Sequence, residues 1–147
     1  MATWPYYLFA VAAGAMLPFQ FGINAVLARY VEGAARASLV SFAVGTLALL
    51  VAVLFFRGAP ALAKAGAAPW WVWIGGLLGA FYVLGSVVTA PRLGAATLVA
   101  LILAGQAAAS LTVDHFGLVG FQESPVTPGR LLGILLVALG VVLVRVL

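Results

Sequence analysis

Hydrophobic residues are gathered into five long stretches, and the charged residues lie between these stretches or near their ends. The clearest stretch lies between Arg92 and Asp114, where twenty-one consecutive residues carry no charge. A helix rises about 1.5 Å per residue, so this stretch is long enough to cross a hydrocarbon core of roughly 30 Å. We therefore predict an all-α integral membrane protein with five spans. They cover about residues 6–28, 37–56, 70–90, 93–113 and 128–147.

The polar residues inside the fourth span fall on one face of the predicted helix. Gln106 lies near the middle of the span, and Ser110 and Asp114 follow four and eight residues later. A primary amide without a partner in hydrocarbon is strongly unfavourable, so Gln106 must face protein, water or a ligand. This face is a candidate substrate-binding surface that includes Gln106 and Ser110.

The first span carries a second polar stripe, because Gln20 and Asn24 are one helical turn apart. Each amide has two interpretations. It makes a hydrogen bond to another helix, worth roughly 0.6–2 kcal/mol, or it binds a substrate near mid-membrane, where transporter sites lie. If two inverted copies pair, Gln20 and Gln106 of both would place four amides around one cavity. Asn24 lies closer to the membrane surface, which favours a structural bond at that position.

Asp114 is the one carboxylate at the boundary of a span, and His115 follows it directly. A carboxylate beside a histidine is a candidate for proton coupling. The structural alternative is a helix-end carboxylate that reaches water and pairs with Arg92 or with an arginine of an inverted copy. His115 is then an interfacial side chain.

Small residues recur at helical spacing in three spans, a pattern that is typical of helices packed closely against each other. In the third span Gly75 and Gly79 form a GxxxG motif. The other predicted helix-packing residues are Ser41 and Gly45 in the second span and Gly133 and Gly140 in the fifth span.

Three further signals predict local features of the helices. Pro18 cannot donate to the carbonyl of Gly14, so the first helix should kink there. Ser38 is a candidate N-cap of the second span. Thr127 followed by Pro128 predicts the N-cap and the first residue of the last helix.

The composition supports a membrane protein and excludes several other classes. Hydrophobic residues make up 66% of the 147 residues and charged residues only 7%, whereas soluble domains have about 25% charged residues. This length leaves room for five spans and for no separate soluble domain, so we predict a single membrane domain over residues 1–147. With no cysteine, one histidine and three acids, the sequence offers neither a metal site nor a catalytic cluster. We expect no enzymatic activity and no cofactor.

The formal charge of +4 does not indicate a nucleic-acid partner, because the seven basic residues are single and scattered. Five spans divide these residues between the two sides of the membrane. Arg57, Lys64 and Arg130 lie on the side of the N-terminus, and Arg29, Arg36, Arg92 and Arg145 lie on the other side. Three against four is almost no positive-inside bias, so the chain can insert both ways and pair with its own inverted copy. The alternative is that insertion selects one orientation despite this balance.

Five segments carry a resemblance to a known family. They are FQFGINAVLARY in the first span, LVSFAVGTLALL in the second, WWVWIGGLLGAFYV in the third, PRLGAATLVALILAGQAAASLTVDHFG in the fourth and RLLGILLVALGVVL in the fifth. In these segments the chain resembles the YdcZ-like family, the half-length, five-helix branch of the drug/metabolite transporter superfamily. The resemblance implies an antiparallel homodimer with ten helices in the bacterial inner membrane and an export role. By position, the family pattern carries onto Gln20, Asn24, Gln106 and Asp114.

One departure from the wider superfamily bears on energy coupling. The related four-helix multidrug transporters have a glutamate in their first span, and the first span here has no carboxylate, which argues against proton coupling by that route. We predict an exporter of a small solute that works by alternating access. The alternatives are a dual-topology channel for an ion or small solute, and an accessory subunit of another membrane complex. The expected partners are an inverted copy, membrane lipid and a small molecule whose identity the sequence leaves open.

Overall fold

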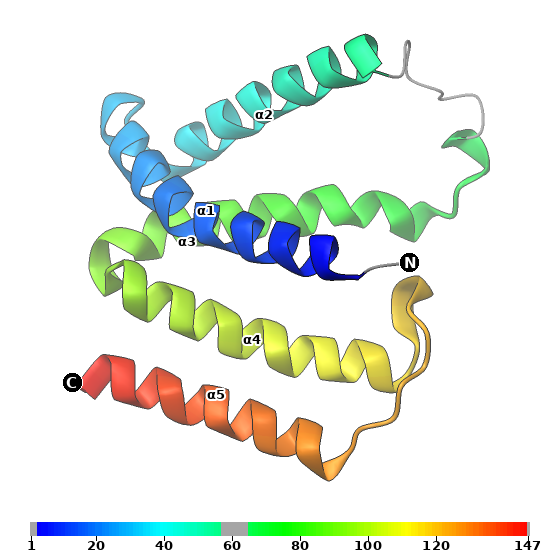
Figure 1. Ribbon diagram of the computed structural model, residues 1–147. Helices are drawn as coiled ribbons and strands as arrows, with labels where there is room; N and C mark the ends of the chain where they lie inside the picture. Colours follow the sequence, from blue (N-terminus) through cyan, green and yellow to red (C-terminus); the bar gives the residue numbers. More distant parts are fainter. Residues whose placement is uncertain (1–2, 57–64, 147) are drawn as a thin grey trace. The chain divides into compact units, whose positions relative to one another are not determined.

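The structure, a computed structural model, describes residues 3–56 and 65–146, which contain only helices and the connections between them. Five of these helices are long and apolar enough to cross a membrane, which confirms the all-α class and the predicted number of spans. They are α1 (Trp4–Tyr30), α2 (Ala34–Phe56), α3 (Ile74–Leu93), α4 (Ala95–His115) and α5 (Pro128–Val146), shown in Figure 1. The connections hold three short 3₁₀ helices, η1 (Ala65–Ala67), η2 (Trp70–Trp73) and η3 (Leu118–Gly120).

The helices begin and end close to the predicted spans. The clearest difference is at α2, which begins at Ala34, so that Ser38 lies inside the helix. The Ser38 hydroxyl donates to the Ala34 carbonyl at 2.9 Å, and the prediction of Ser38 as an N-cap is wrong. The predicted third span starts as η2 and continues as α3. Residues 57–64 and residue 147, which include Arg57 and Lys64, lie outside the described residues.

The chain divides into two compact units, Met1–Arg92 and Leu93–Leu147. In both units, large apolar side chains are exposed along the helices, as Phe9 in α1 and Leu135 in α5 illustrate. Such surfaces suit a protein whose solvent is lipid, because lipid tails are as apolar as leucine. The single membrane domain expected from the sequence stays a prediction.

The core of the first unit lies where the end of α1, the start of α2 and the second half of α3 meet. Ala37 of α2 is fully buried there beside Val83 and Val87 of α3. Leu27 and Val31, at the end of α1, pack against this cluster. Because alanine is small, it lets α1 and α2 approach each other closely.

A tight turn joins α1 to α2. Glu32 and Gly33 both have positive φ, at 56° and 151°. The Arg36 guanidinium donates to the carbonyls of Val31 and Glu32, each at 3.3 Å, and pairs with the Glu32 carboxylate at 3.4 Å. A cation beside the carbonyls at the C-terminal end of α1 is favourable for the helix dipole, so Arg36, which bonds to the C-cap residue Val31, stabilises this turn.

Helix α1 continues through Pro18, which lacks the N–H that would complete one helical hydrogen bond. Figure 1 shows the two halves of α1 running in different directions. This change of direction is the kink expected from a proline inside a helix.

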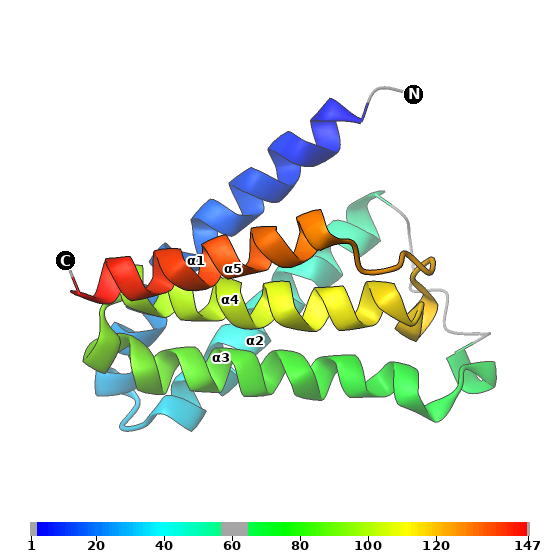
Figure 2. The same ribbon diagram turned by 90° about the horizontal axis from the view of Figure 1, so that it is seen from below.

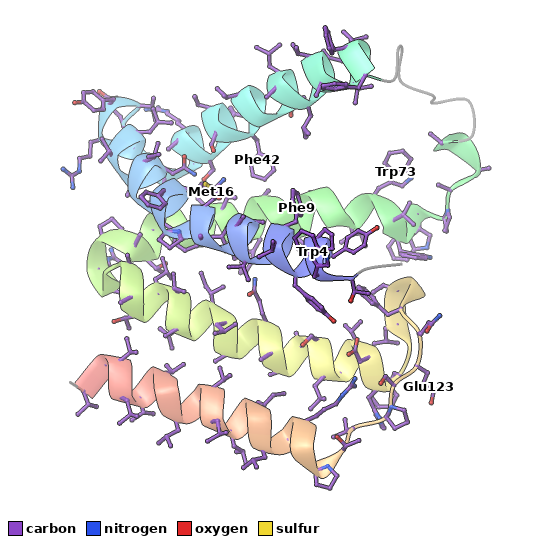
Figure 3. The ribbon with its side chains drawn as sticks, viewed as in Figure 1. Trp4, Phe9, Met16, Phe42, Trp73 and Glu123 are labelled. Carbon is purple, nitrogen blue, oxygen red and sulfur yellow. The ribbon has the colours of Figure 1, made fainter. Side chains whose placement is uncertain are left out.

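Among the predicted helix-packing glycines, Gly79 lies against another helix. A Cβ atom at Gly79 would be 3.6 Å from Cζ of Phe42, whose ring reaches from α2 toward α3 in Figure 3. At Gly45, Gly75, Gly133 and Gly140 a Cβ atom would meet nothing within 4 Å in the described part of the chain. Ser41 is half-buried. The packing role of these five residues stays a prediction, and their faces have room for a neighbouring helix.

The second unit is a helical hairpin. Helices α4 and α5 lie side by side and run in opposite directions (Figure 1 and Figure 2). Thr127 Oγ1 accepts the backbone N–H of Arg130 at 3.3 Å, and Pro128 is the first residue of α5. This confirms the predicted N-cap. The hairpin places the last turn of α4 beside the first turn of α5.

Candidate functional site

A groove with a volume of about 430 Å³ lies between α4 and α5. This volume is within the range of about 300–1,000 Å³ that is usual for small-molecule sites. Its lining residues come from one face of each helix: Ala107, Ser110, Leu111 and Asp114 from α4, and Arg130, Gly133, Ile134 and Val137 from α5. The groove therefore includes two members of the polar face predicted for the fourth span, Ser110 and Asp114.

The polar end of the groove is an ion pair between the two helices. Asp114 lies in the last turn of α4 and Arg130 in the first turn of α5, and Nη1 of Arg130 is 3.6 Å from Oδ2 of Asp114. The Asp114 and Arg130 side chains are 37% and 41% exposed. An ion pair with this exposure contributes about 0–1 kcal/mol, so it is not a major source of stability.

Backbone hydrogen bonds in the connection hold these two residues in place. The Ser124 N–H donates to the backbone carbonyl of Asp114 at 2.7 Å. The Ser124 carbonyl in turn accepts from Nη1 of Arg130 at 3.2 Å. The Thr127 cap fixes the direction in which α5 leaves the connection. The charged end of the groove is thus positioned by the backbone more than by the ion pair itself.

The connection is also attached to His115. The Val126 N–H donates to Nδ1 of His115 at 3.3 Å, and the imidazole lies edge-to-face against Phe116, with ring centroids 4.6 Å apart. His115 therefore has a structural partner, and it is not among the residues that line the groove. The coupling role considered for Asp114 and His115 stays a prediction.

The structure corrects the partner of Asp114. The sequence suggested Arg92 or an arginine of an inverted copy. Arg92 precedes α4 and Asp114 lies in its last turn, so a helix of 21 residues separates these two residues along the chain. The arginine beside Asp114 is Arg130. Sequence reasoning missed this residue, because it was interpreted only as a cation at the end of a helix. The available signal was its position in the first turn of the helix that follows Asp114.

The predicted amides differ in how exposed they are. Gln106 is exposed on α4, one turn before Ser110, and its side chain makes no hydrogen bond within the described residues. The Ser110 hydroxyl donates to the Ala107 carbonyl at 3.0 Å. Gln20 is half-buried on α1, and Asn24 follows one turn later. A single cavity that contains Gln20 and Gln106 stays a prediction.

Asn24 is buried, with only 3% of its surface exposed, and its Nδ2 atom has no hydrogen-bond partner among the described residues. The buried hydroxyl of Tyr82 on α3 likewise has no partner there. Phe21, one turn before Asn24, contacts the Tyr82 ring edge-to-face at a centroid distance of 6.1 Å. Unpartnered polar groups are unfavourable in a protein interior, so both groups have hydrogen-bonding capacity left for a ligand or a partner chain. The sequence analysis did not identify Tyr82, because a tyrosine among apolar residues resembles ordinary helix packing.

Among the described residues, no three histidine, aspartate or glutamate side chains lie close enough together to hold a metal ion. The groove instead offers one anion, one cation, one hydroxyl and an aliphatic wall. This set of groups can bind a small molecule that has a charged end and an apolar body.

Five membrane-length helices and a groove of this kind define a small multi-pass membrane protein. Residues 5–143 match the family described as "Putative inner membrane exporter, YdcZ", and the chain belongs to this family. The chain is also 33% identical over 113 residues to "Inner membrane protein YdcZ" of Escherichia coli (strain K12), an alignment that covers 74% of this chain and 73% of that protein. No solved structure matches the chain.

The comparisons confirm the family resemblance seen in the sequence. The chain is a multi-pass protein of the inner membrane, as predicted. The family description also indicates a membrane transporter.

Proposed function

We propose that the chain exports a small organic solute by alternating access, as an antiparallel homodimer of the drug/metabolite transporter type. The observation that carries this proposal is the groove between α4 and α5, which combines the charged groups of Asp114 and Arg130 with an aliphatic wall. The family description, which is that of an exporter, supports the direction of transport. Neither the composition nor the groove suggests an enzyme, and we assign no catalytic step.

The position of the groove suits a solute that crosses the membrane. Asp114 and Arg130 lie at the helix ends, where water is close, and Ala107 and Val137 are each seven residues further into their helices. Seven residues correspond to about 10 Å of helix, so the groove leads from the membrane boundary toward the midplane. Gln106 directly precedes Ala107 in α4 and does not itself line the groove. We propose that it receives the solute after the solute has left the groove.

An antiparallel second copy would supply the inverted half that a single chain lacks. A transporter that exposes its site alternately to each side is commonly built from two halves of inverted topology. One chain has five spans and almost balanced basic residues, so it can provide either half. The open faces at Gly45, Gly75, Gly133 and Gly140 leave room for helices of the second copy.

Counterflow in proteoliposomes tests the proposal. Vesicles are loaded with one unlabelled solute from a panel of cations, anions and zwitterions, and uptake of the same labelled solute is measured. A carrier accelerates uptake because the loaded solute returns its site to the outside, whereas a channel does not. Uptake without acceleration would favour the channel. No uptake of any member of the panel would favour an accessory subunit.

Gln106→Ala connects this measurement to a residue. We expect its counterflow to fall at least tenfold, while homodimer formation and thermal stability stay near those of the unmodified protein, because the exposed Gln106 side chain makes no hydrogen bond within the described residues. Gln106→Asn should change the preferred solute. Thr112→Ala is the control, since the one hydrogen bond that the exposed Thr112 hydroxyl makes to the described residues is to the Ala108 carbonyl of its own helix. Normal counterflow by Gln106→Ala, with a stability loss of about 0.6–2 kcal/mol, would assign Gln106 to helix packing instead.

A further inference from the structure

The ion pair at the end of the groove leaves much of its hydrogen-bonding capacity unused. Nη1 of Arg130 and Oδ2 of Asp114 are 3.6 Å apart, whereas charge-assisted N–H···O bonds are about 2.7–2.9 Å long. The guanidinium has five N–H donors, and its one hydrogen bond within the described residues is to the Ser124 carbonyl. The Asp114 carboxylate can accept several bonds and accepts none of normal length within the described residues. Both groups can therefore bind a ligand while staying where the backbone holds them.

The rest of the groove has a different chemistry. Its wall is aliphatic, made by Ala107 and Leu111 of α4 and by Ile134 and Val137 of α5. Ser110 adds one hydroxyl, but its proton is already donated to the Ala107 carbonyl. The groove is thus polar at one end and apolar over the remaining length.

Resting on the proposed function, we infer that the transported solute is a zwitterion with an apolar body, of the kind represented by an apolar amino acid. Its ammonium group binds the Asp114 carboxylate and its carboxylate binds the Arg130 guanidinium. The apolar body lies along the aliphatic wall between α4 and α5. The hydroxyl oxygen of Ser110 is a further acceptor for the ammonium group.

Charge pairing distinguishes a zwitterion from a singly charged solute. An amine that binds Asp114 competes with Arg130 for the carboxylate and leaves the guanidinium without an anionic partner. A carboxylic acid that binds Arg130 leaves Asp114 unpaired in the same way. A zwitterion replaces one long ion pair with two charge-assisted contacts and leaves the total charge of the groove unchanged.

Matched ligands test this inference directly. Leucine is compared with isopentylamine, which lacks the carboxylate, and with 4-methylpentanoate, which lacks the ammonium group. Phenylalanine, phenethylamine and 3-phenylpropanoate form a second set with a larger body. Binding to the full-length protein in nanodiscs is measured by calorimetry. We expect at least one zwitterion to bind tenfold or more tightly than either singly charged analogue of the same body.

Two variants test which charged group of the solute binds Asp114 and which binds Arg130. With Asp114→Asn, the zwitterion should lose at least tenfold in affinity and bind no better than the matching carboxylate. With Arg130→Gln, it should bind no better than the matching amine. Glu123→Gln and Arg145→Gln are the controls and should stay within twofold of the unmodified protein. Glu123 lies on the connection between the two helices in Figure 3 and Arg145 at the far end of α5, and neither residue lines the groove.

Several outcomes would overturn the inference. An amine or a carboxylate that binds as tightly as the zwitterion contradicts it, and so does the absence of binding by both zwitterions. If a variant fails to fold, the ligand series on the unmodified protein still decides. Zwitterion binding that is lost when phosphatidylethanolamine replaces phosphatidylglycerol in the nanodisc would make the occupant a lipid headgroup. Failure of transport is separate: zwitterion binding without counterflow contradicts the transporter, whereas counterflow of a singly charged solute contradicts only the solute class.

Discussion

Asn24 differs from the other buried polar residues in the way its hydrogen bonds are satisfied. The hydroxyls of Ser38 and Ser86 donate to carbonyls of their own helices, at 2.9 and 2.7 Å. The Nδ2 group of Asn24 has no partner among the described residues, although this residue is only 3% exposed. A serine hydroxyl can donate to a carbonyl of its own helix. The Asn24 amide makes no such bond, so its hydrogen-bond partner must come from outside its helix.

Replacing Asn24 with leucine separates a binding role from a structural one. We expect Asn24→Leu to keep the thermal stability of the unmodified protein or to raise it, because an unpartnered amide is exchanged for an apolar group of similar size. If Asn24 contacts the solute, counterflow should fall at least tenfold. Ser86→Ala is the control and should change neither quantity appreciably. A clear loss of stability with normal counterflow would show that Asn24 bonds to another helix of the assembly.

Residue patterns predicted one half of the groove and missed the other half. The spacing of Gln106, Ser110 and Asp114 placed them on one face of a helix, and two of the three line the groove. Arg130 lies in another helix, and its distance from Asp114 depends on the path of the connection. That path is fixed by bonds such as the one from Val126 to His115, which no spacing rule contains.

At the scale of the element, the connection between α4 and α5 requires a particular residue at one position, Gly117. Gly117 has φ 59°, in the left-handed region, directly after the last turn of α4. A Cβ atom there would lie 3.3 Å from the backbone nitrogen of Glu123. The chain thus needs glycine at this position both for its φ angle and for the close return of the connection.

Three glycine variants separate these two requirements. Gly117→Ala should destabilise the protein by about 1–2 kcal/mol through its φ angle, and further through the contact with Glu123. Gly120→Ala has the strain alone, since φ is 89° and its Cβ atom would meet nothing within 4 Å. Gly129→Ala, inside α5, should be neutral or slightly stabilising. Thermal unfolding in detergent measures the order, and equal stability of the Gly117 and Gly129 variants would contradict this account.

The helices themselves could be predicted well because the membrane requires them. An uncharged stretch of this length must satisfy its backbone hydrogen bonds internally, so α4 follows almost directly from the run between Arg92 and Asp114. Helix partners could not be predicted in the same way, because the same aliphatic residues suit lipid and protein equally. The GxxxG motif illustrates this limit: a Cβ atom at Gly79 would touch Phe42, while a Cβ atom at Gly75 would meet no other part of the described residues within 4 Å.

At the scale of the whole molecule, the two sides of the membrane are nearly indistinguishable by charge. The five predicted spans place three basic residues on one side of the membrane and four on the other side. The short connections that hold them are the segments in which lysine and arginine decide orientation. A difference of one charge gives little preference, and the proposed antiparallel homodimer requires that both orientations occur.

Added lysines should therefore decide the orientation in either direction. Ala67→Lys with Ala68→Lys raises the N-terminal side from three basic residues to five, against four on the other side. Ala35→Lys with Ala96→Lys raises the other side to six, against three. We expect the two double variants to adopt opposite single orientations, because the more basic side stays in the cytoplasm. The unmodified protein should show both orientations. Labelling of a C-terminal tag from each side of the inner membrane measures the fraction of chains in each orientation.

Each double variant alone should lose counterflow, and co-expression of the two should restore it. An unmodified protein with its C-terminus on one side only would contradict the homodimer, unless a separate chain supplies the inverted half.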